Sequence, residues 1–390
     1  MNSLERVKAA ISFSSPDKAP IINFGKANSD VVPLVTMPSE NWKPGHAEDE
    51  KGLFPRADGF RWEKPEWAKD SKYDAWKTLS HEEIDEWGCF WNQDGTGSTM
   101  GHPGRPSLPD WSNLEEYLTR YTPDPEDKSR YTLFLKLGEM SKGKYYRMAL
   151  LGPYAPLMVA MNMRGFSNFL ADHHRNPDKI KELLAHLTEY FVKNMKMWVK
   201  YGGKPDGFMI ADDLGTQDRP FMSPKLFEKI YEPVYRTLYD TAHELKCEFH
   251  HHSCGKIDKI MPILMEWGLD AIEFDSPRMS GYPDLRPFRG KIMMWGCVNI
   301  QSIYTQGTPE ECEREVWHMV RNLGTPEGGF GAYFYDETYH ILAPKENIRA
   351  FKKGMRNYAN YSTIPPHWWT YPIVEKWEDN IVPPLPPKNL

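Results

Sequence analysis

The residues with the clearest capacity for chemistry lie in the segment His252-Ser253-Cys254-Gly255. His252 and Cys254 are two positions apart, so at the end of an extended strand both side chains project to the same side. An imidazole and a thiolate form a zinc ligand pair, and an open coordination position would make such a site catalytic. The same pattern also occurs where a buried cysteine packs beside a hydrogen-bonded histidine, but the place at a strand end favours the metal site. Gly255 permits a sharp turn after the pair, and alternation puts His250 on the side of His252, as an outer partner rather than a ligand.

Three further predicted strands run into polar residues of the same kinds. Asp212-Asp213 follows one strand, Cys297-Val298-Asn299 follows another, and Asp336-Glu337 follows a third. In a barrel of parallel strands the active site forms where the carboxyl ends of the strands meet. Four strands that end in metal-competent or acid/base residues therefore indicate one site.

Each of these residues has a competing interpretation. One of the two aspartates is expected to cap a helix, and Asp212 is the preferred functional residue. Cys297 is either a third thiolate ligand or a core residue beside a turn. Trp295, Tyr333 and Tyr335 are predicted to ring the mouth of the site, although aromatic side chains at such positions are commonly part of the core.

The elements that position these residues alternate regularly after residue 130. Short apolar runs are expected to be strands at 19–24, 147–151, 207–211, 247–252, 271–274, 291–296 and 329–335. Amphipathic stretches between them predict helices near 177–201, 224–245, 257–267, 309–323 and 345–360. Thr308-Pro309-Glu310-Glu311 carries a capping residue, a first-turn proline and a glutamate that can close a capping box.

This alternation predicts a parallel sheet, and seven or eight units favour a closed (β/α)8 TIM barrel. An open doubly wound sheet is the alternative, but no Gly-x-Gly-x-x-Gly follows an early strand. Residues 1–365 are expected to form one barrel domain, and 366–390 a C-terminal tail. Residues 40–130 are expected to be an irregular insertion, because seven of the 14 tryptophans fall between 40 and 111 with many Pro and Gly residues. Large rings can clamp a loop-rich segment, which is either a lid or a packed insertion.

Composition excludes several classes of protein. The net charge is −6, and the 48 basic residues are dispersed, which is not typical of a protein that binds nucleic acid or an anionic membrane surface. Five cysteines fit a reducing cytosol better than a disulfide framework. No apolar signal region or membrane-length apolar stretch is present in the sequence, so we expect a cytoplasmic protein.

A series of motifs resembles the uroporphyrinogen decarboxylase superfamily, in particular its corrinoid-dependent methyltransferase branch. They occur in order over residues 3–350: Ser3-Leu4-Glu5-Arg6-Val7, Pro16-Asp17-Lys18-Ala19-Pro20, Gly152-Pro153-Tyr154, Asp212-Asp213-Leu214-Gly215-Thr216-Gln217, Ser223-Pro224, His252-Ser253-Cys254-Gly255, Gln301 with Gly307-Thr308-Pro309-Glu310, and Ala343-Pro344-Lys345-Glu346-Asn347. The resemblance implies a (β/α)8 barrel. Decarboxylases of the family carry an arginine-bearing segment after the first strand, whereas this chain has Gly25-Lys26-Ala27-Asn28 there.

The methyltransferases of the family bind zinc through His-x-Cys and a later cysteine near the last strand. The resemblance therefore implies His252 and Cys254 as ligands. Counting back from Pro344-Lys345-Glu346-Asn347, the position of the later cysteine falls on Glu337. A carboxylate also binds zinc, so Glu337 rather than Cys297 is predicted to be the third ligand.

The function implied is methyl transfer from a methoxylated aromatic compound to the Co(I) of a partner corrinoid protein. Asp212 or Tyr335 would donate a proton to the poor alkoxide or phenolate leaving group, and Trp295, Asn299 and Tyr333 would contact the substrate. The alternatives are methyl transfer from a corrinoid to a thiol, a decarboxylase-like activity, and a metal-free barrel that only binds a ligand or a corrinoid partner. A homodimer is a possible assembly.

Overall fold

Eight strands form one sheet in the order β1-β11-β10-β9-β8-β7-β6-β2, in a computed structural model of the chain. The structure describes residues 1–24, 28–42, 80–94, 101–335, 341–364 and 367–370. Parallel pairing runs from β1 through β11, β10, β9, β8 and β7 to β6. The strands are β1 (Ile21–Ile22), β2 (Val31–Val35), β6 (Tyr146–Leu150), β7 (Gly207–Ala211), β8 (Glu248–His252), β9 (Ala271–Phe274), β10 (Met293–Gly296) and β11 (Phe330–Tyr333). The predicted (β/α)8 barrel is confirmed.

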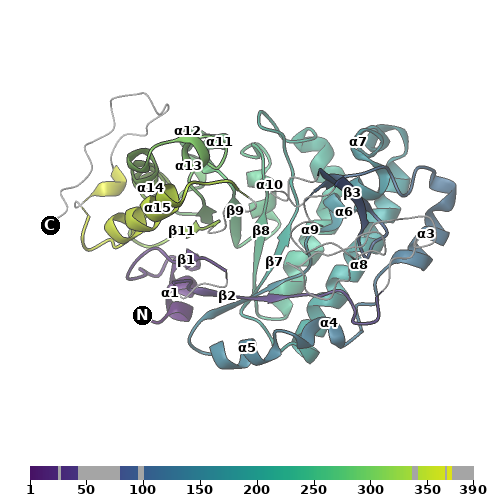
Figure 1. Ribbon diagram of the computed structural model, residues 1–390, viewed down its shortest axis with the longest axis horizontal. Helices are drawn as coiled ribbons and strands as arrows, with labels where there is room; N and C mark the ends of the chain where they lie inside the picture. Colours follow the sequence, from purple (N-terminus) through teal and green to yellow (C-terminus); the bar gives the residue numbers. More distant parts are fainter. Residues whose placement is uncertain (25–27, 43–79, 95–100, 336–340, 365–366, 371–390) are drawn as a thin grey trace. The chain divides into compact units, whose positions relative to one another are not determined.

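The described residues fall into two units, of which the first holds the barrel. It comprises residues 1–34, 136–150 and 205–390. Its helices are α1 (Ser3–Ile11), most of α5 (Leu135–Ser141), α9 (Pro224–Glu244), α10 (Met261–Glu266), α11 (Pro277–Ser280), α12 (Tyr282–Leu285), η3 (Arg286–Phe288), α13 (Ile303–Gln306), α14 (Pro309–Leu323), α15 (Lys345–Tyr358) and η4 (Trp368–Thr370). Figure 1 shows β7, β8 and β9 side by side.

The second unit comprises residues 35–135 and 151–204. It contains an antiparallel sheet of β3 (Ser80–Ile84), β4 (Phe90–Asp94) and β5 (His102–Pro103). Its helices are η2 (Trp111–Asn113), α3 (Leu114–Tyr121), α4 (Ser129–Thr132), α6 (Pro156–Arg164), α7 (Phe166–Arg175) and α8 (Pro177–Tyr201). Of the aromatic-rich region, residues 43–79 lie outside the described residues, and its predicted role as a lid stays a prediction.

Helix starts follow the local signals in the sequence. The Thr308 side chain accepts a hydrogen bond from the Glu311 amide, and the Glu311 side chain accepts one from the Thr308 amide, so the predicted capping box is present at α14. Ser223 caps α9 by accepting a hydrogen bond from the Leu226 amide, with Pro224 in the first turn. None of the described helices combines the length and the apolar character that crossing a bilayer requires.

Period-two alternation along β8 decides which side chains face the barrel interior. Glu248, His250 and His252 face inward, whereas His251 faces outward, toward Tyr239 of α9. Apolar residues fill the interior below the site: Met148, Met209, Ala271, Met293 and Trp295, with Val7 and Ala10 of α1 packed in the same cluster. Because side chains fill the barrel interior, we expect the active site at the carboxyl ends of the strands, as in other barrels of this type.

Candidate metal centre

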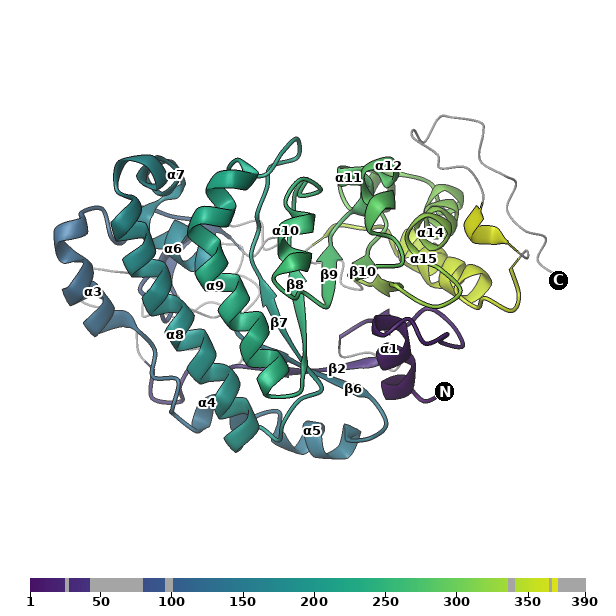
Figure 2. The same cartoon turned by 180° about the vertical axis from the view of Figure 1, so that it is seen from behind.

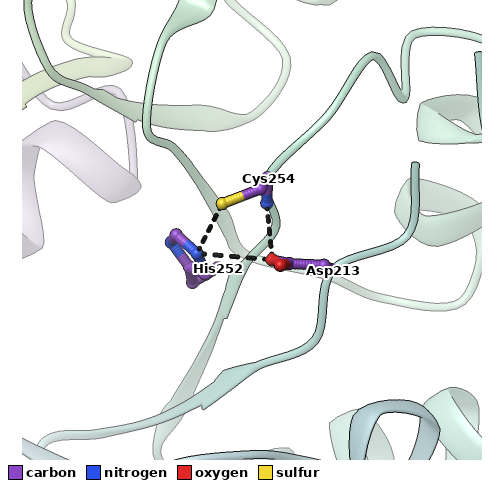
Figure 3. Close-up of side chains that lie close together, drawn as sticks. All are labelled: Asp213, His252 and Cys254. Carbon is purple, nitrogen blue, oxygen red and sulfur yellow. Dashed lines mark hydrogen bonds and ion pairs between the residues drawn. The ribbon is translucent and has the colours of Figure 1, made fainter. Parts of the chain in front are cut away.

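The ends of β7 and β8 bring His252, Cys254 and Asp213 together (Figure 3). Ala211 pairs with His252 in the parallel register, and the Asp212 amide donates to the His252 carbonyl at 3.0 Å. The chain then turns at Gly255, whose φ is +90° and where a Cβ would lie 2.3 Å from the Gly215 carbonyl oxygen. Only glycine fits this turn, because a side chain would meet both the left-handed backbone and its neighbour.

Two of the three separations between the ligand atoms match those of a tetrahedral zinc site. His252 Nε2 is 3.5 Å from Cys254 Sγ and 3.6 Å from Asp213 Oδ1, and all three atoms lie within 4.8 Å of one another. Zinc bonds of ordinary length at tetrahedral angles separate nitrogen and sulfur ligands by about 3.6 Å, and nitrogen and oxygen ligands by about 3.4 Å. These two separations therefore fit a zinc ion that His252 shares with Cys254 and Asp213.

Glu273 of β9 fixes the other side of the His252 ring. Its Oε2 is hydrogen-bonded to His252 Nδ1, and the Glu273 side chain is completely buried. A carboxylate on the second ring nitrogen is the usual outer partner of a metal-binding histidine, because it orients the ring and holds the tautomer that leaves Nε2 free. This contact is the second feature that fits a metal centre.

In the metal-free protein, electrostatic interactions keep a proton on the hydrogen-bonded pair of His252 and Glu273. Burial disfavours the charged imidazole, but Glu273 and Asp275 outweigh it and raise the pKa of His252 well above 6.5. Burial also raises the pKa of Glu273. Both shifts favour a proton held between the two side chains near neutral pH.

Cys254 is a protonated thiol in the metal-free protein. Burial raises its pKa above 9.0, and Asp275 and Asp213 raise it further against the effect of His252. The Sγ donates to Asp275 Oδ2, and the Cys254 amide donates to Asp213 Oδ1 at 3.0 Å. A bound divalent cation reverses this balance, because it stabilises the thiolate directly.

Asp212, the aspartate preferred from the sequence, faces away from this group. Its side chain is completely buried and its Oδ2 accepts a hydrogen bond from Tyr235 of α9 at 2.8 Å. Successive residues at a strand end point to opposite sides, so Asp213 rather than Asp212 faces His252 and Cys254.

Tyr335, predicted to be catalytic, lies beside the metal-competent residues. Its hydroxyl donates to Asp275 Oδ1, so Asp275 bridges Tyr335 and Cys254. Its ring lies 5.0 Å from that of Tyr333, and the Tyr333 ring meets Phe24 edge-on at 5.8 Å. Burial raises the pKa of both tyrosines, so both hydroxyls remain protonated at neutral pH.

The remaining predicted residues are placed as follows. Trp295 is completely buried and donates from Nε1 to His250 Nδ1 at 3.2 Å, which makes it a core residue below the site. Asn299 accepts from the Gln301 amide at 3.0 Å in the loop after β10. Cys297 is completely buried and belongs to neither group of metal-competent side chains found among the described residues. Glu337 lies outside the described residues, and its role as a ligand stays a prediction.

Sequence reasoning missed Glu273 and Asp275, and it ranked Asp213 below Asp212. His252, Glu273 and Asp275 form a second group whose ligand atoms lie within 4.8 Å of one another. A signal was present, because Glu273 is a charged residue inside the otherwise apolar strand Ala271–Phe274. A buried charge in such a strand needs a partner, and this is itself a sign of a site.

Comparisons with known proteins agree with this fold. The family model described as uroporphyrinogen decarboxylase (URO-D) matches residues 94–343, which is more than half of the chain. Among solved structures, a methyltransferase from Methanosarcina mazei is similar, with a TM-score of 0.54 and 14% sequence identity over 91% of this chain and 98% of that one. No curated protein matches the chain in sequence. At this identity the structural likeness concerns the fold.

Proposed function

The chain belongs to the uroporphyrinogen decarboxylase family, and from this premise we propose that it is a zinc-dependent methyltransferase. The proposed reaction moves a methyl group from a methoxylated aromatic compound to the Co(I) of a partner corrinoid protein. The observation that carries the proposal is the close grouping of His252, Cys254 and Asp213, in which the separations of Nε2 from Sγ and from Oδ1, 3.5 and 3.6 Å, match a tetrahedral zinc site. The fold shared with a methyltransferase supports the choice of methyl transfer.

His252, Cys254 and Asp213 would hold the zinc ion, with Glu273 orienting the His252 ring. When bound, zinc supplies a Lewis acid that stabilises the negative charge developing on the leaving oxygen. A set of one nitrogen, one sulfur and one oxygen ligand is harder than a two-thiolate set, which suits an oxygen-containing substrate. Glu337 remains a proposed ligand, as a fourth protein donor or as a replacement for Asp213.

Tyr335 is the residue that we propose to donate the proton that the reaction needs. In the overall transfer, the bond between methyl carbon and ether oxygen breaks, a bond between that carbon and cobalt forms, and the phenolate takes up a proton. The Tyr335 hydroxyl is protonated at neutral pH because burial raises its pKa. In the metal-free protein this proton is donated to Asp275, so the hydroxyl would have to turn from Asp275 to the leaving oxygen when the substrate is bound.

Aromatic rings beside the ligands support a flat substrate. Tyr333 and Tyr335 form a tilted pair, and Phe24 meets Tyr333 edge-on. Rings in such arrangements offer faces and edges that bind another ring. An aryl methyl ether fits these surroundings better than methanol, which has no ring to contact them.

The test is to incubate the zinc-loaded protein with a Co(I) corrinoid and candidate methyl donors, and to follow methyl-Co(III) by absorbance. We expect aryl methyl ethers to react faster than methanol or methylamines. Tyr335→Phe should lower the rate about 100-fold, the lower end of the effect of a positioned acid. Tyr333→Phe, the matched loss of a neighbouring hydroxyl, should leave the rate within about 3-fold, well below that effect. Equal turnover of methanol, or transfer from a methylated corrinoid to a thiol, would overturn the proposed direction and substrate.

A second experiment assigns the oxygen ligand. Asp213→Asn, Glu337→Gln and Cys297→Ser are compared for zinc affinity by competition with a chromophoric chelator. We expect the asparagine variant to lose at least about 10-fold in affinity and the serine variant to retain wild-type affinity. If Glu337→Gln loses affinity and Asp213→Asn does not, Glu337 is the ligand and Asp213 is not.

A further inference from the structure

We propose that two buried tyrosines of α9, Tyr235 and Tyr239, are positioning residues that fix the ends of both ligand-bearing strands. Among the described residues, neither hydroxyl is hydrogen-bonded to His252, Cys254 or Asp213. Each is hydrogen-bonded to an outward-facing residue whose neighbour in sequence is an inward-facing ligand. The inference rests on the proposed zinc centre and concerns how the fold fixes the positions of the ligand side chains.

The two contacts have the same form and lie entirely within the protein. Tyr235 donates to Asp212 Oδ2 at 2.8 Å, and the Tyr239 hydroxyl is hydrogen-bonded to His251 Nδ1 at 2.9 Å. All four side chains are completely buried. Water therefore cannot replace either hydroxyl without a change in packing, and buried hydrogen bonds of this kind restrict the position of both partners.

The strand register transmits this restriction to the ligands. Asp212 and His251 are followed directly by Asp213 and His252, which point to the opposite side. The Asp212 amide also donates to the His252 carbonyl, so the two strand ends move together. A shift of Asp212 or His251 therefore changes the distances between the ligand atoms inside the barrel.

Helix α9 carries both tyrosines and holds their hydroxyls in fixed positions relative to the strands. Tyr235 and Tyr239 are four residues apart and thus on one face of the helix. Their rings are nearly parallel, 6.3 Å apart, and the row continues through Tyr231 and Phe227 to Trp267. Figure 2 shows α9 running alongside β7 and β8, and the helix contacts β8. The stacked rings limit the directions in which the two hydroxyls can point.

Both contacts are made by neutral hydroxyl groups. Burial raises the pKa of both tyrosines, so each keeps its proton. The His251 Nε2 has no hydrogen-bond partner among the described residues, so Tyr239 supplies the side-chain hydrogen bond of this ring. Removal of the Tyr239 hydroxyl takes that bond away.

The test uses Tyr235→Phe and Tyr239→Phe, which remove one oxygen and keep the ring row. Tyr282→Phe is the matched control, because Tyr282 donates to buried Glu315 at 2.6 Å between α12 and α14, away from the ligand strands. For each full-length variant, Zn²⁺ affinity is measured by chelator competition. The absorption spectrum of the Co(II)-substituted protein reports ligand geometry, and urea unfolding of the metal-free protein reports stability.

We expect both α9 variants to bind Zn²⁺ about 10-fold more weakly, as when partners outside the ligand set are removed. Their Co(II) spectra should change, whereas Tyr282→Phe should lower stability and leave affinity and spectrum unaltered. The inference is overturned if the α9 variants bind Zn²⁺ as the wild type does, or if Tyr282→Phe weakens binding equally. If the wild type itself binds no Zn²⁺, the proposed function fails first, and the two failures are thereby distinguished.

Discussion

Two histidines of β8 lie two residues apart on the inner face of the barrel, yet they have opposite chemistry. His252 meets carboxylates and a thiol at the strand end, and its pKa is raised well above 6.5 by Glu273 and Asp275 against the effect of burial. His250 lies among neutral partners, and burial lowers its pKa to about 3. The two residues are of one type on one strand, so their different pKa shifts come from the side chains around them.

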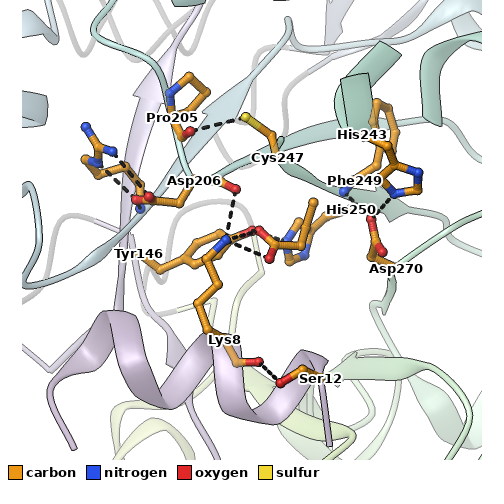
Figure 4. A network of polar contacts seen from close by, with 12 residues as sticks. Lys8, Ser12, Tyr146, Pro205, Asp206, His243, Cys247, Phe249, His250 and Asp270 are labelled. Carbon is orange, nitrogen blue, oxygen red and sulfur yellow. Dashed lines mark hydrogen bonds and ion pairs between the residues drawn. The ribbon is translucent and has the colours of Figure 1, made fainter. Parts of the chain in front are cut away.

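The network around His250 leaves no ring nitrogen for a metal. Trp295 donates to His250 Nδ1, so in the neutral ring the proton is on Nε2, which lies 2.8 Å from the Tyr146 hydroxyl. Tyr146 donates in turn to Glu248, which also accepts from Lys8 of α1 (Figure 4). Every donor in this series meets an acceptor, which is typical of a buried network that stabilises the core.

The largest effect is expected for His252→Ala. Loss of one of the proposed protein ligands should weaken Zn²⁺ binding by about 1000-fold, since zinc binds to structural sites with about 10–16 kcal/mol in total. Metal content after gel filtration and chelator competition measure this loss, and circular dichroism checks that the variant folds. A folded variant that retains stoichiometric zinc would show that His252 is not a ligand.

His250→Ala should give the complementary result. It leaves the Trp295 indole and the Tyr146 hydroxyl without their partner inside the barrel, which we expect to lower the free energy of unfolding by about 3 kcal/mol. Zinc stoichiometry should remain that of the wild type. Urea unfolding and metal analysis of the same preparation test both statements, and loss of zinc with unchanged stability would reverse the roles of the two histidines.

The pH dependence of stability should report the neutral histidines. Burial lowers the pKa of both His250 and His251 to about 3 from 6.5. A depressed pKa makes the stabilisation complete above 6.5 and progressively lost as the pH falls toward 3. At about pH 5, each histidine should account for a loss of about 2 kcal/mol in the free energy of unfolding. Unfolding of metal-free protein over this range measures how steeply the free energy of unfolding changes with pH. This slope corresponds to the number of protons taken up on unfolding, and His250→Gln should reduce that number by about one. An unchanged slope in that variant would contradict the assignment.

Lys8→Met should have the smallest effect. The Lys8 ammonium bonds Glu248 at 2.6 Å, but its side chain is 38% exposed. Exposed ion pairs contribute little, so we expect a loss of about 1 kcal/mol or less, and less still at high salt. Unfolding at low and high ionic strength is the measurement. A loss as large as that of His250→Ala would mean that the network acts as one unit.

Much of the barrel could be predicted from the sequence, because each strand and helix has strong local signals. Strands β7 and β9, and helices α8 and α14, have the bounds expected from apolar runs and caps. Strand β2 was missed, since Pro33 lies inside Val31–Val35 and lowers its strand character. Tertiary pairing with β6 overrides this local preference.

The site could be predicted only in part. His252 and Cys254 were identified because both lie at one strand end, two positions apart. The choice between Asp212 and Asp213 depends on which residue of β7 faces inward, and this is set by pairing with β8. The contact of Glu273 with His252 depends likewise on the β8–β9 register, which no local pattern of residues reveals.

The placement of α1 has a consequence for the order in which the chain can fold as it is synthesised. Helix α1 is made before the other described elements, yet Lys8 pairs with Glu248, and the Ala10 carbonyl accepts from the Gly329 amide at 2.9 Å. Ser15 donates from its amide to the Glu327 carbonyl at the same distance. Contacts between residues so far apart in the sequence form late in folding. A long loop must close first, and its entropic cost opposes the contact. While the ribosome is still translating β8 to β11, Val7 and Ala10 lack the interior that buries them in the finished barrel. A nascent chain halted before residue 327 should therefore expose α1 to proteases that the complete protein resists.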